Sequence, residues 1–387
     1  VSTGDLVGEV ALLTGEARNA NVIAETDMKL WSLSKKDFDR LLETYPDVRS
    51  FLTELVTERL TSSKKMADRK ISKYLIRQKI GQGGYALVYR GRHQLLNRPV
   101  AVKMMKHDMA MDRDFLENFR NEARVIAALD HKNIVRVYDI EEKYKTLFII
   151  MELLSGNALE DILVARKKLP YLKMIDYLIQ TCQGLEYAHK NGIIHQDIKP
   201  ANIFITDEDQ VKVLDFGLAV PIATENTDSL GTPYYMSPEQ IEMEAVDGRA
   251  DIYALGIMTY EIIIGRRPYP EDDLIKLMDL HVEQDIPDPW ETDPDIPKEL
   301  RQFILKACER DREKRFQDAG EVLDFLAPLE QKYNIQKAPP AEDREQIHSL
   351  LLVSKASQQM ELIKLLDEFS QKAEKLGVDI RSIDYRT

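Results

Sequence analysis

Residues 193–202 read IIHQDIKPAN, and residues 213–217 read VLDFG. Both stretches place polar side chains on short loops beside apolar runs. They contain a carboxylate, an ammonium group, a carboxamide and a second carboxylate, in the order Asp197, Lys199, Asn202 and Asp215. A reaction that moves a charged phosphoryl group needs a carboxylate to orient the hydroxyl nucleophile, a cation to offset developing charge, and oxygen ligands for Mg²⁺. The two stretches therefore indicate phosphoryl transfer.

These two stretches resemble the catalytic loop and the metal-binding turn of protein kinases, and Lys199 occupies the position typical of serine/threonine kinases. The resemblance implies ATP and Mg²⁺ as cofactors. Asp197 would accept or orient the substrate hydroxyl proton, and Lys199 would stabilise the γ-phosphoryl group. Asn202 and Asp215 would hold Mg²⁺. Gln196 departs from the pattern, because the family commonly has an arginine here that pairs with a phosphate on the activation loop.

Composition excludes several classes of protein. The chain has 387 residues, of which 44% are hydrophobic and 31% are charged, as expected for two or three soluble globular domains. A net charge of −13 argues against binding to nucleic acids or anionic membranes. No apolar run reaches the roughly 18 residues of a membrane span. Cys182 and Cys308 lie in apolar helical patterns, which predicts inert core thiols and a reducing, cytoplasmic location.

Residues 1–60 contain a second recognisable pattern. Gly8 and Glu9 begin a loop of small residues that continues to Arg18. Glu9 could accept a hydrogen bond from a ribose hydroxyl, and Arg18 could pair with a cyclic phosphate. The arrangement resembles the phosphate-binding cassette of cyclic-nucleotide-binding domains, which implies cAMP or cGMP as a ligand. The alternative is a surface turn with an incidental ion pair.

The rest of this segment predicts one strand and two helices. Residues 22–33 alternate like a strand, and the patterns of residues 37–42 and 46–60 resemble the helices that follow such a cassette. The strands that should precede Gly4 are missing. Since the chain also lacks a starting methionine, we expect a fragment of a longer protein that holds the C-terminal half of the domain.

A glycine-rich hairpin is predicted at residues 80–89. Gly81 and Gly83 would let backbone N–H groups approach nucleotide phosphates closely, although the kinase pattern has a third glycine where this chain has Ala86. Lys103 follows on an alternating strand and resembles the kinase lysine that contacts the α/β-phosphates. The resemblance assigns three further residues to the nucleotide site: Ile80, Val88 and Ala101.

An amphipathic helix is predicted over residues 115–127, where apolar residues recur at helical spacing. Glu122 on this helix resembles the glutamate that pairs with the strand lysine. The apolar strand that ends near residue 154 leads into a hinge. By resemblance Met151 is the gatekeeper, and the backbones of Glu152 and Leu154 hydrogen-bond adenine.

The activation segment lies between residues 217 and 237. It contains hydroxyl side chains that are predicted phosphorylation sites: Thr224, Thr227 and Ser229. Because Gln196 cannot pair with a phosphate, phosphorylation here is expected to have weak or substrate-docking effects rather than to switch the protein on. Thr232 lies in a stretch that resembles the substrate-facing loop and would contact Asp197 and Lys199.

Other residues have predicted structural roles. A long amphipathic helix over residues 172–191 ends at Asn-Gly, a common helix stop. By resemblance His195 is a scaffold residue of the catalytic loop, and Asp251 braces the backbone of that loop. Glu239 is expected to pair with Arg315.

The predicted fold is therefore α+β. It is a bilobal protein kinase fold behind a partial β-roll cyclic-nucleotide-binding-like domain, with a helical C-terminal tail. The predicted boundaries are 1–60 for the partial domain, 61–73 for a linker, 74–153 for the small kinase lobe, 154–327 for the large kinase lobe, and 328–387 for the tail. Residues 362–376 repeat at heptad-like spacing, which predicts either self-association or a helix packed on the kinase.

The sequence predicts a serine/threonine protein kinase of the bacterial type that acts on protein substrates and is regulated by the N-terminal sensor. Two alternatives stay open. One is a nucleotide-binding pseudokinase or scaffold that performs no chemistry, and the other is a chain that acts mainly as a cyclic-nucleotide receptor.

Overall fold

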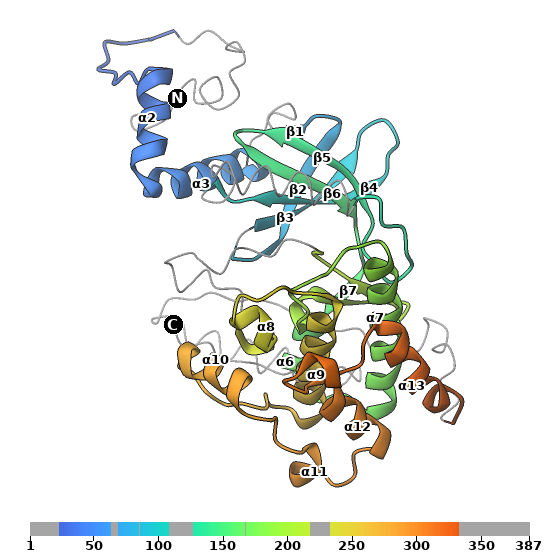
Figure 1. The fold of residues 1–387 in the computed structure, drawn as a ribbon. Coiled ribbons are helices and arrows are strands. Elements are labelled where there is room, and N and C mark those ends of the chain that lie inside the picture. The colour runs from blue at the N-terminus through green and yellow to red at the C-terminus, as the bar shows by residue number, and fades with distance from the viewer. Residues whose placement is uncertain are drawn as a thin grey trace, which may run out of the picture.

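The computed structural model describes residues 23–62, 69–84, 86–107, 127–166, 168–216 and 233–332. These residues form a small lobe built on a six-stranded sheet and a large lobe that is mainly helical (Figure 1). Two N-terminal helices lie beside the small-lobe sheet. The predicted bilobal α+β fold is confirmed.

The small-lobe sheet is antiparallel, with the strand order β1-β2-β3-β4-β6-β5. Its strands are β1 (Lys70–Ile71), β2 (Tyr74–Gln82), β3 (Ala86–His93), β4 (Pro99–Met105), β5 (Val137–Lys143) and β6 (Thr146–Glu152). Side chains on a strand alternate between its two faces. On β4, Val102 and Met104 therefore lie on the opposite face from Ala101 and Lys103. Strand β1 falls within the segment 61–73 that was predicted as a linker.

Helices α2 (Lys35–Thr44) and α3 (Pro46–Ser62) confirm the two helices predicted upstream of the kinase lobes. On α3, Leu52, Val56 and Leu60 recur every four residues and are buried in one cluster with the small-lobe sheet. Full burial of one leucine or valine stabilises a fold by roughly 1.5–3 kcal/mol. Three such residues contribute an appreciable share of a net stability of about 5–15 kcal/mol. Helix α3 is therefore part of the small lobe's core.

The predicted strand at residues 22–33 is wrong over the residues that the structure describes. Residues 23–34 form neither a strand nor a helix. Their large apolar side chains are exposed: Ile23, Met28, Leu30, Trp31 and Leu33. A strand needs a partner for its backbone N–H and C=O groups, and in the described part of the chain no strand pairs with this segment.

The large lobe combines helices with a three-stranded sheet of order β7-β8-β9. Its strands are β7 (Gly156–Ala158), β8 (Ile203–Thr206) and β9 (Val211–Val213), and its longer helices are α6 (Leu159–Arg166), α7 (Tyr171–Lys190), α9 (Gly248–Ile264), α10 (Leu274–Glu283), α12 (Lys298–Ala307) and α13 (Ala319–Lys332). Shorter elements are η2 (Pro200–Asn202), η4 (Pro233–Tyr235), α8 (Pro238–Ile241), α11 (Pro289–Thr292) and η5 (Arg312–Lys314). Helix α7 ends where predicted, with Gly192 at φ 75° just beyond it.

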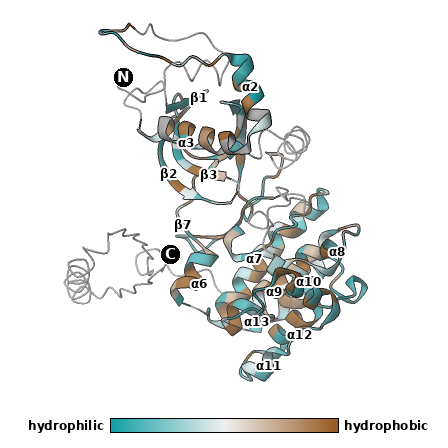
Figure 2. Ribbon diagram, turned by 90° about the vertical axis from the view of Figure 1, so that its left-hand side faces the viewer, coloured by the Kyte–Doolittle hydropathy of each residue, from teal (hydrophilic) through white to brown (hydrophobic). Residues whose placement is uncertain are grey.

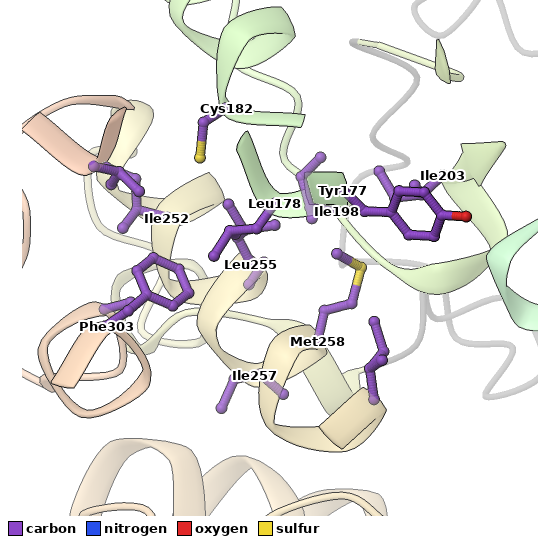
Figure 3. Packing of buried hydrophobic residues seen from close by; sticks show 14 of the residues in the cluster. Tyr177, Leu178, Cys182, Ile198, Ile203, Ile252, Leu255, Ile257, Met258 and Phe303 are labelled. Atoms are coloured by element: carbon purple, nitrogen blue, oxygen red, sulfur yellow. The ribbon is translucent and has the colours of Figure 1, made fainter. Parts of the chain in front are cut away.

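The core of the large lobe surrounds α9, which is apolar nearly all round. Figure 3 shows Leu178 of α7 close to Leu255 of α9, and Ile198 of the catalytic loop in the same cluster. The catalytic loop is therefore anchored on its apolar side by the core. Cys182 and Cys308 are buried and free, as predicted, and burial raises the pKa of both thiols.

No helix in the described part of the chain is long and apolar enough to cross a membrane. The predicted tail helix lies outside the described residues, which end at residue 332, and so does the stretch 108–126 with most of the predicted amphipathic helix.

A buried histidine gives the large lobe a testable pH dependence. His281 of α10 lies against the Tyr253 and Tyr269 rings, and burial lowers its pKa from 6.5 to about 4. The unfolded chain therefore binds the proton more readily, so the stability that this residue contributes is fully present above about pH 6.5 and is lost as the pH falls toward 4. We expect the free energy of unfolding to drop by roughly 2 kcal/mol from this residue between about pH 7 and pH 5. Urea unfolding of the wild type and of His281→Gln checks this expectation. An equal drop in both proteins would contradict it.

Candidate active site

The catalytic loop brings three of the predicted residues into direct contact. Lys199 Nζ lies 2.8 Å from Asp197 Oδ2. The Asn202 amide nitrogen donates to the Asp197 carbonyl at 2.8 Å and to Asp197 Oδ2 at 2.9 Å. Because both amide hydrogens of Asn202 face Asp197, the amide oxygen points elsewhere and can act as a ligand. Asp197 is thus held by two donors, while its side chain is still 37% exposed to incoming substrate.

The second pair connects the two lobes. Lys103 Nζ on β4 lies 2.7 Å from Asp215 Oδ1 on the turn after β9. Asp215 has φ 57°, a left-handed conformation that is uncommon outside glycine and tends to occur at functional sites. The N–H of Leu214 donates to the Asn202 carbonyl at 2.8 Å, so the turn is tied to the catalytic loop. The four residues predicted to carry the chemistry and the small-lobe lysine therefore belong to one connected network.

An apolar cluster lies on the Lys103 face of the small-lobe sheet. Its buried members are Ala101, Val135 and Met151, and the partly buried residues packed against them are Val88, Val137, Leu153, Leu154 and Leu214. Four of the predicted nucleotide-binding residues gather here: Val88, Ala101, Met151 and Leu154. The sequence did not assign Val135 or Leu214 to this site. Val135 belongs to the small lobe, and Leu214 joins the cluster from the large lobe.

The glycine-rich turn joins β2 and β3. The Gly83 N–H donates to the Ala86 carbonyl at 2.8 Å, and Gly81 pairs with Val88 across the hairpin. Ile80 is 46% exposed and lies outside the apolar cluster. Lys106 donates to the Gly84 carbonyl at 2.5 Å, so the turn is attached to the end of β4.

Glu152 at the hinge has contacts that the sequence did not reveal. Its carboxylate accepts from the Arg136 N–H and from Lys212 Nζ, both at 2.8 Å. The Glu152 N–H donates to the Arg136 carbonyl at 2.9 Å. Of the Glu152 backbone, only the carbonyl is therefore left to hydrogen-bond an adenine ring. Lys212 lies on β9, the strand that leads to Asp215. Glu152 therefore links the hinge to the metal-binding turn.

Asp251 braces the catalytic loop, as predicted. Its buried carboxylate accepts from the N–H groups of His195 at 2.8 Å and Gln196 at 2.7 Å, and from His189 Nε2 at 2.7 Å. Burial alone would raise the pKa of Asp251, but these hydrogen bonds and the facing histidines lower it below its usual value. His195 is a scaffold residue, since it is buried and its Nε2 donates to the Leu214 carbonyl at 2.6 Å.

The backbone of Gln196 is held in a left-handed conformation, with φ 65°. Its N–H is bonded to Asp251, and its carbonyl accepts from Gln240 Nε2 at 3.0 Å. The Gln196 side chain is exposed. Interactions on both sides of the peptide thus hold a conformation that most residues avoid.

A buried ion pair fixes α8 to the rest of the large lobe. Arg315 meets Glu239 through two hydrogen bonds of 2.7 and 2.9 Å, as predicted. The same guanidinium donates to the carbonyls of Glu309 and Arg310. Because every partner is buried or backbone, this pair is structural rather than catalytic.

Several predicted site residues lie outside the described residues, and their roles stay predictions. They are Gly8, Glu9, Arg18, Glu122, Thr224, Thr227, Ser229 and Thr232.

The residues present fit Mg²⁺. The free amide oxygen of Asn202 and the second carboxylate oxygen of Asp215 are the hard oxygen ligands that Mg²⁺ takes in proteins. Among the described residues no group of three or more histidine, cysteine, aspartate or glutamate side chains could hold a metal alone. Mg²⁺ usually takes one or two protein carboxylates and completes its shell with water and substrate phosphate oxygens.

Comparison with known proteins agrees with this geometry. Residues 74–324 match the protein kinase domain family, and residues 1–45 match the cyclic nucleotide-binding domain family. The chain is 39% identical over 266 residues to a probable serine/threonine-protein kinase of Clostridium acetobutylicum, covering 68% of this chain and 40% of that protein. It is 38% identical over 272 residues to serine/threonine-protein kinase PknB of Mycobacterium leprae, covering 68% and 43%. The chain thus spans about two fifths of the length of these relatives.

The fold is also similar to a solved structure. The Mycobacterium tuberculosis PknI kinase domain superposes with a TM-score of 0.57 at 25% identity, covering 68% of this chain and 97% of that one. Since the kinase family model matches well over half of the chain, this protein belongs to the protein kinase family.

Proposed function

We propose that this chain is a protein kinase that transfers the γ-phosphoryl group of ATP to serine and threonine hydroxyls of proteins. The observation that supports this most is the network of Lys103, Asp215, Asn202, Asp197 and Lys199, in which each member is within 2.9 Å of the next or is tied to it through the Leu214 backbone. The names of the relatives favour serine and threonine over tyrosine as acceptors.

Each residue has a task in this reaction. Asp197 would orient the acceptor hydroxyl and take up its proton, and Lys199 beside it would offset charge on the transferred group. Lys103, which pairs with Asp215 in the structure, would bind the α/β-phosphates of ATP, either in place of Asp215 or together with it. Asn202 and Asp215 would hold Mg²⁺, which would supply further positive charge to offset that of the phosphates. The apolar cluster around Met151 would take the adenine ring, and the reducing cytoplasm is the compartment that suits the two free thiols.

The test is transfer of labelled γ-phosphate to the chain itself and to a generic basic protein. We expect incorporation with Mg²⁺ and a fall to background when a chelator removes the metal, because phosphate charge is then no longer neutralised. Restoring Mg²⁺ should restore the rate. Equal incorporation with and without divalent metal would contradict the assignment of Asn202 and Asp215.

The pseudokinase alternative makes a different forecast for the same sample. A nucleotide-binding scaffold would bind ATP and transfer nothing under any condition. The complete set of Lys103, Asp197, Asn202 and Asp215 favours catalysis over this alternative.

A second function is favoured by the family match at residues 1–45. We propose that this segment derives from a cyclic-nucleotide sensor and that Arg18 and Glu9 would hold cAMP or cGMP. Calorimetric titration of the full chain with each nucleotide, with Arg18→Ala as the comparison, tests this. Heat in the wild type that is lost in the variant supports it, and equal heats or none would exclude a nucleotide site in this chain.

A further inference from the structure

A polar contact lies inside the apolar interface between α3 and the small-lobe sheet. One cluster of buried apolar residues forms this interface, with Leu52, Val56 and Leu60 from α3 and Val102, Met104 and Phe148 from the sheet. Figure 2 shows α3 lying against this sheet, and Figure 1 shows the same neighbourhood from the side. The residues of β4 that face α3 alternate with Ala101 and Lys103, which face the nucleotide site.

The polar contact joins Thr53 of α3 to His107, the second residue after β4. The Thr53 hydroxyl lies 3.0 Å from His107 Nδ1 and accepts the His107 backbone N–H at 3.0 Å. His107 Nε2 lies 2.8 Å from the Tyr144 carbonyl, which can only accept. Nε2 therefore carries a proton, and Nδ1 faces the Thr53 hydroxyl. His107 is fully buried, so each of these hydrogen bonds replaces water that the ring cannot reach.

His107 stands four residues beyond Lys103, just past the end of the same strand. The neighbouring residue Met105 is fixed from the other side, because its carbonyl accepts the Thr146 hydroxyl at 2.6 Å. In sequence, His107 also begins the stretch that contains Glu122. The Thr53 contact thus fixes the point where the lysine strand ends, 54 residues away along the chain.

Other contacts also hold α3 and α2 to the lobe. The hydroxyl of Tyr89 on β3 donates to the hydroxyl oxygen of Thr57 on α3 at 3.0 Å. Lys145 pairs with Asp39 of α2 at 2.5 Å. Thr57 therefore resembles Thr53 in residue type, helix and kind of bond, but its side-chain partner is Tyr89 of β3 and not His107. Its hydroxyl also donates to the Thr53 carbonyl at 2.7 Å.

We propose that Thr53 and His107 are positioning residues of the kinase, through which helix α3 sets the placement of the Lys103 strand. The proposal rests on the proposed phosphoryl transfer only for its activity readout. Helix α3, which follows the sensor segment, would then help to position the nucleotide site. A change in the position of α3 would shift Lys103.

Three variants of the full chain test this: Thr53→Val, Thr53→Ser and Thr57→Val. Each valine variant removes a hydrogen bond to a buried residue, so both should lower the melting temperature to a similar degree. Thr53→Val should lower kcat/KM for ATP roughly 2- to 30-fold, the range for residues that act on a site indirectly. Thr53→Ser keeps the hydroxyl and should restore the wild-type value. Thr57→Val should stay near wild type, and KM for the protein substrate should be unchanged throughout.

ATP affinity measured by calorimetry with Mg²⁺ gives a second readout that needs no turnover. If the wild type transfers no phosphate, the kinase proposal fails, while a selective loss of ATP affinity in Thr53→Val would still support the positioning role. An unchanged Thr53→Val, or an equal loss in Thr57→Val, would overturn it and leave α3 a stabilising element alone.

Discussion

Replacing Asp197 by asparagine is expected to lower kcat about 10²- to 10⁴-fold, the usual contribution of a positioned acid–base group. Asparagine has nearly the same shape and can still accept the Asn202 hydrogen bond of 2.9 Å, so the loop should keep its structure. Asparagine cannot take up the proton of the substrate hydroxyl, and it cannot neutralise the charge of Lys199, which lies 2.8 Å from Asp197. Steady-state kinetics with a generic basic protein as substrate measures the effect.

The control for this prediction is Glu208→Gln, which neutralises an exposed carboxylate on the turn between β8 and β9. It should leave kcat unchanged. ATP affinity should be similar in both variants, because Asp197 makes no contact with Lys103 or the apolar cluster in the structure. A loss of less than tenfold in Asp197→Asn would remove Asp197 from the chemistry.

Replacing Arg315 by methionine is expected to have the largest effect on stability. The guanidinium is fully buried and meets both oxygens of Glu239, so its removal leaves a buried carboxylate without a partner. Breaking such a pair costs about 3–5 kcal/mol, a large share of the stability of most domains. Denaturant unfolding of the purified chain measures the loss.

Two further variants separate the ion pair from general surface effects. Lys314→Met changes the neighbouring, exposed residue and should alter stability by less than about 0.5 kcal/mol. Glu239→Gln retains a hydrogen-bond acceptor for Arg315 and should cost less than Arg315→Met. Should Arg315→Met lose under about 1 kcal/mol, the pair does not hold α8 in place.

The sequence predicted those parts of the site that depend on local spacing. The residues from Asp197 to Asn202 lie on one short loop, so their mutual contacts follow from a few backbone angles. The pairings of Glu239 with Arg315 and of Asp251 with the catalytic loop are distant in sequence, and the family resemblance predicted them. Composition and periodicity alone would not have paired these residues.

Other features depend on packing between distant segments. Glu152 was assigned through its backbone, whereas its carboxylate connects the hinge to Lys212. Helix α3 was assigned to the sensor, yet its apolar face completes the small-lobe core. Neither contact can be predicted from neighbouring residues, because no motif or spacing around either partner marks the residue that it meets. The strand at residues 22–33 failed for the opposite reason, since alternation was present but no described strand pairs with it.

The most direct test of the central claim is a single-turnover reaction. Wild type and Asp197→Asn are each loaded with labelled ATP and Mg²⁺, and the label is then located on protein by mass spectrometry. We predict that wild-type protein moves the γ-phosphate to serine and threonine hydroxyls, and that the variant binds ATP equally but transfers it far more slowly. Tight ATP binding by the wild type with no label on any serine or threonine would contradict the account.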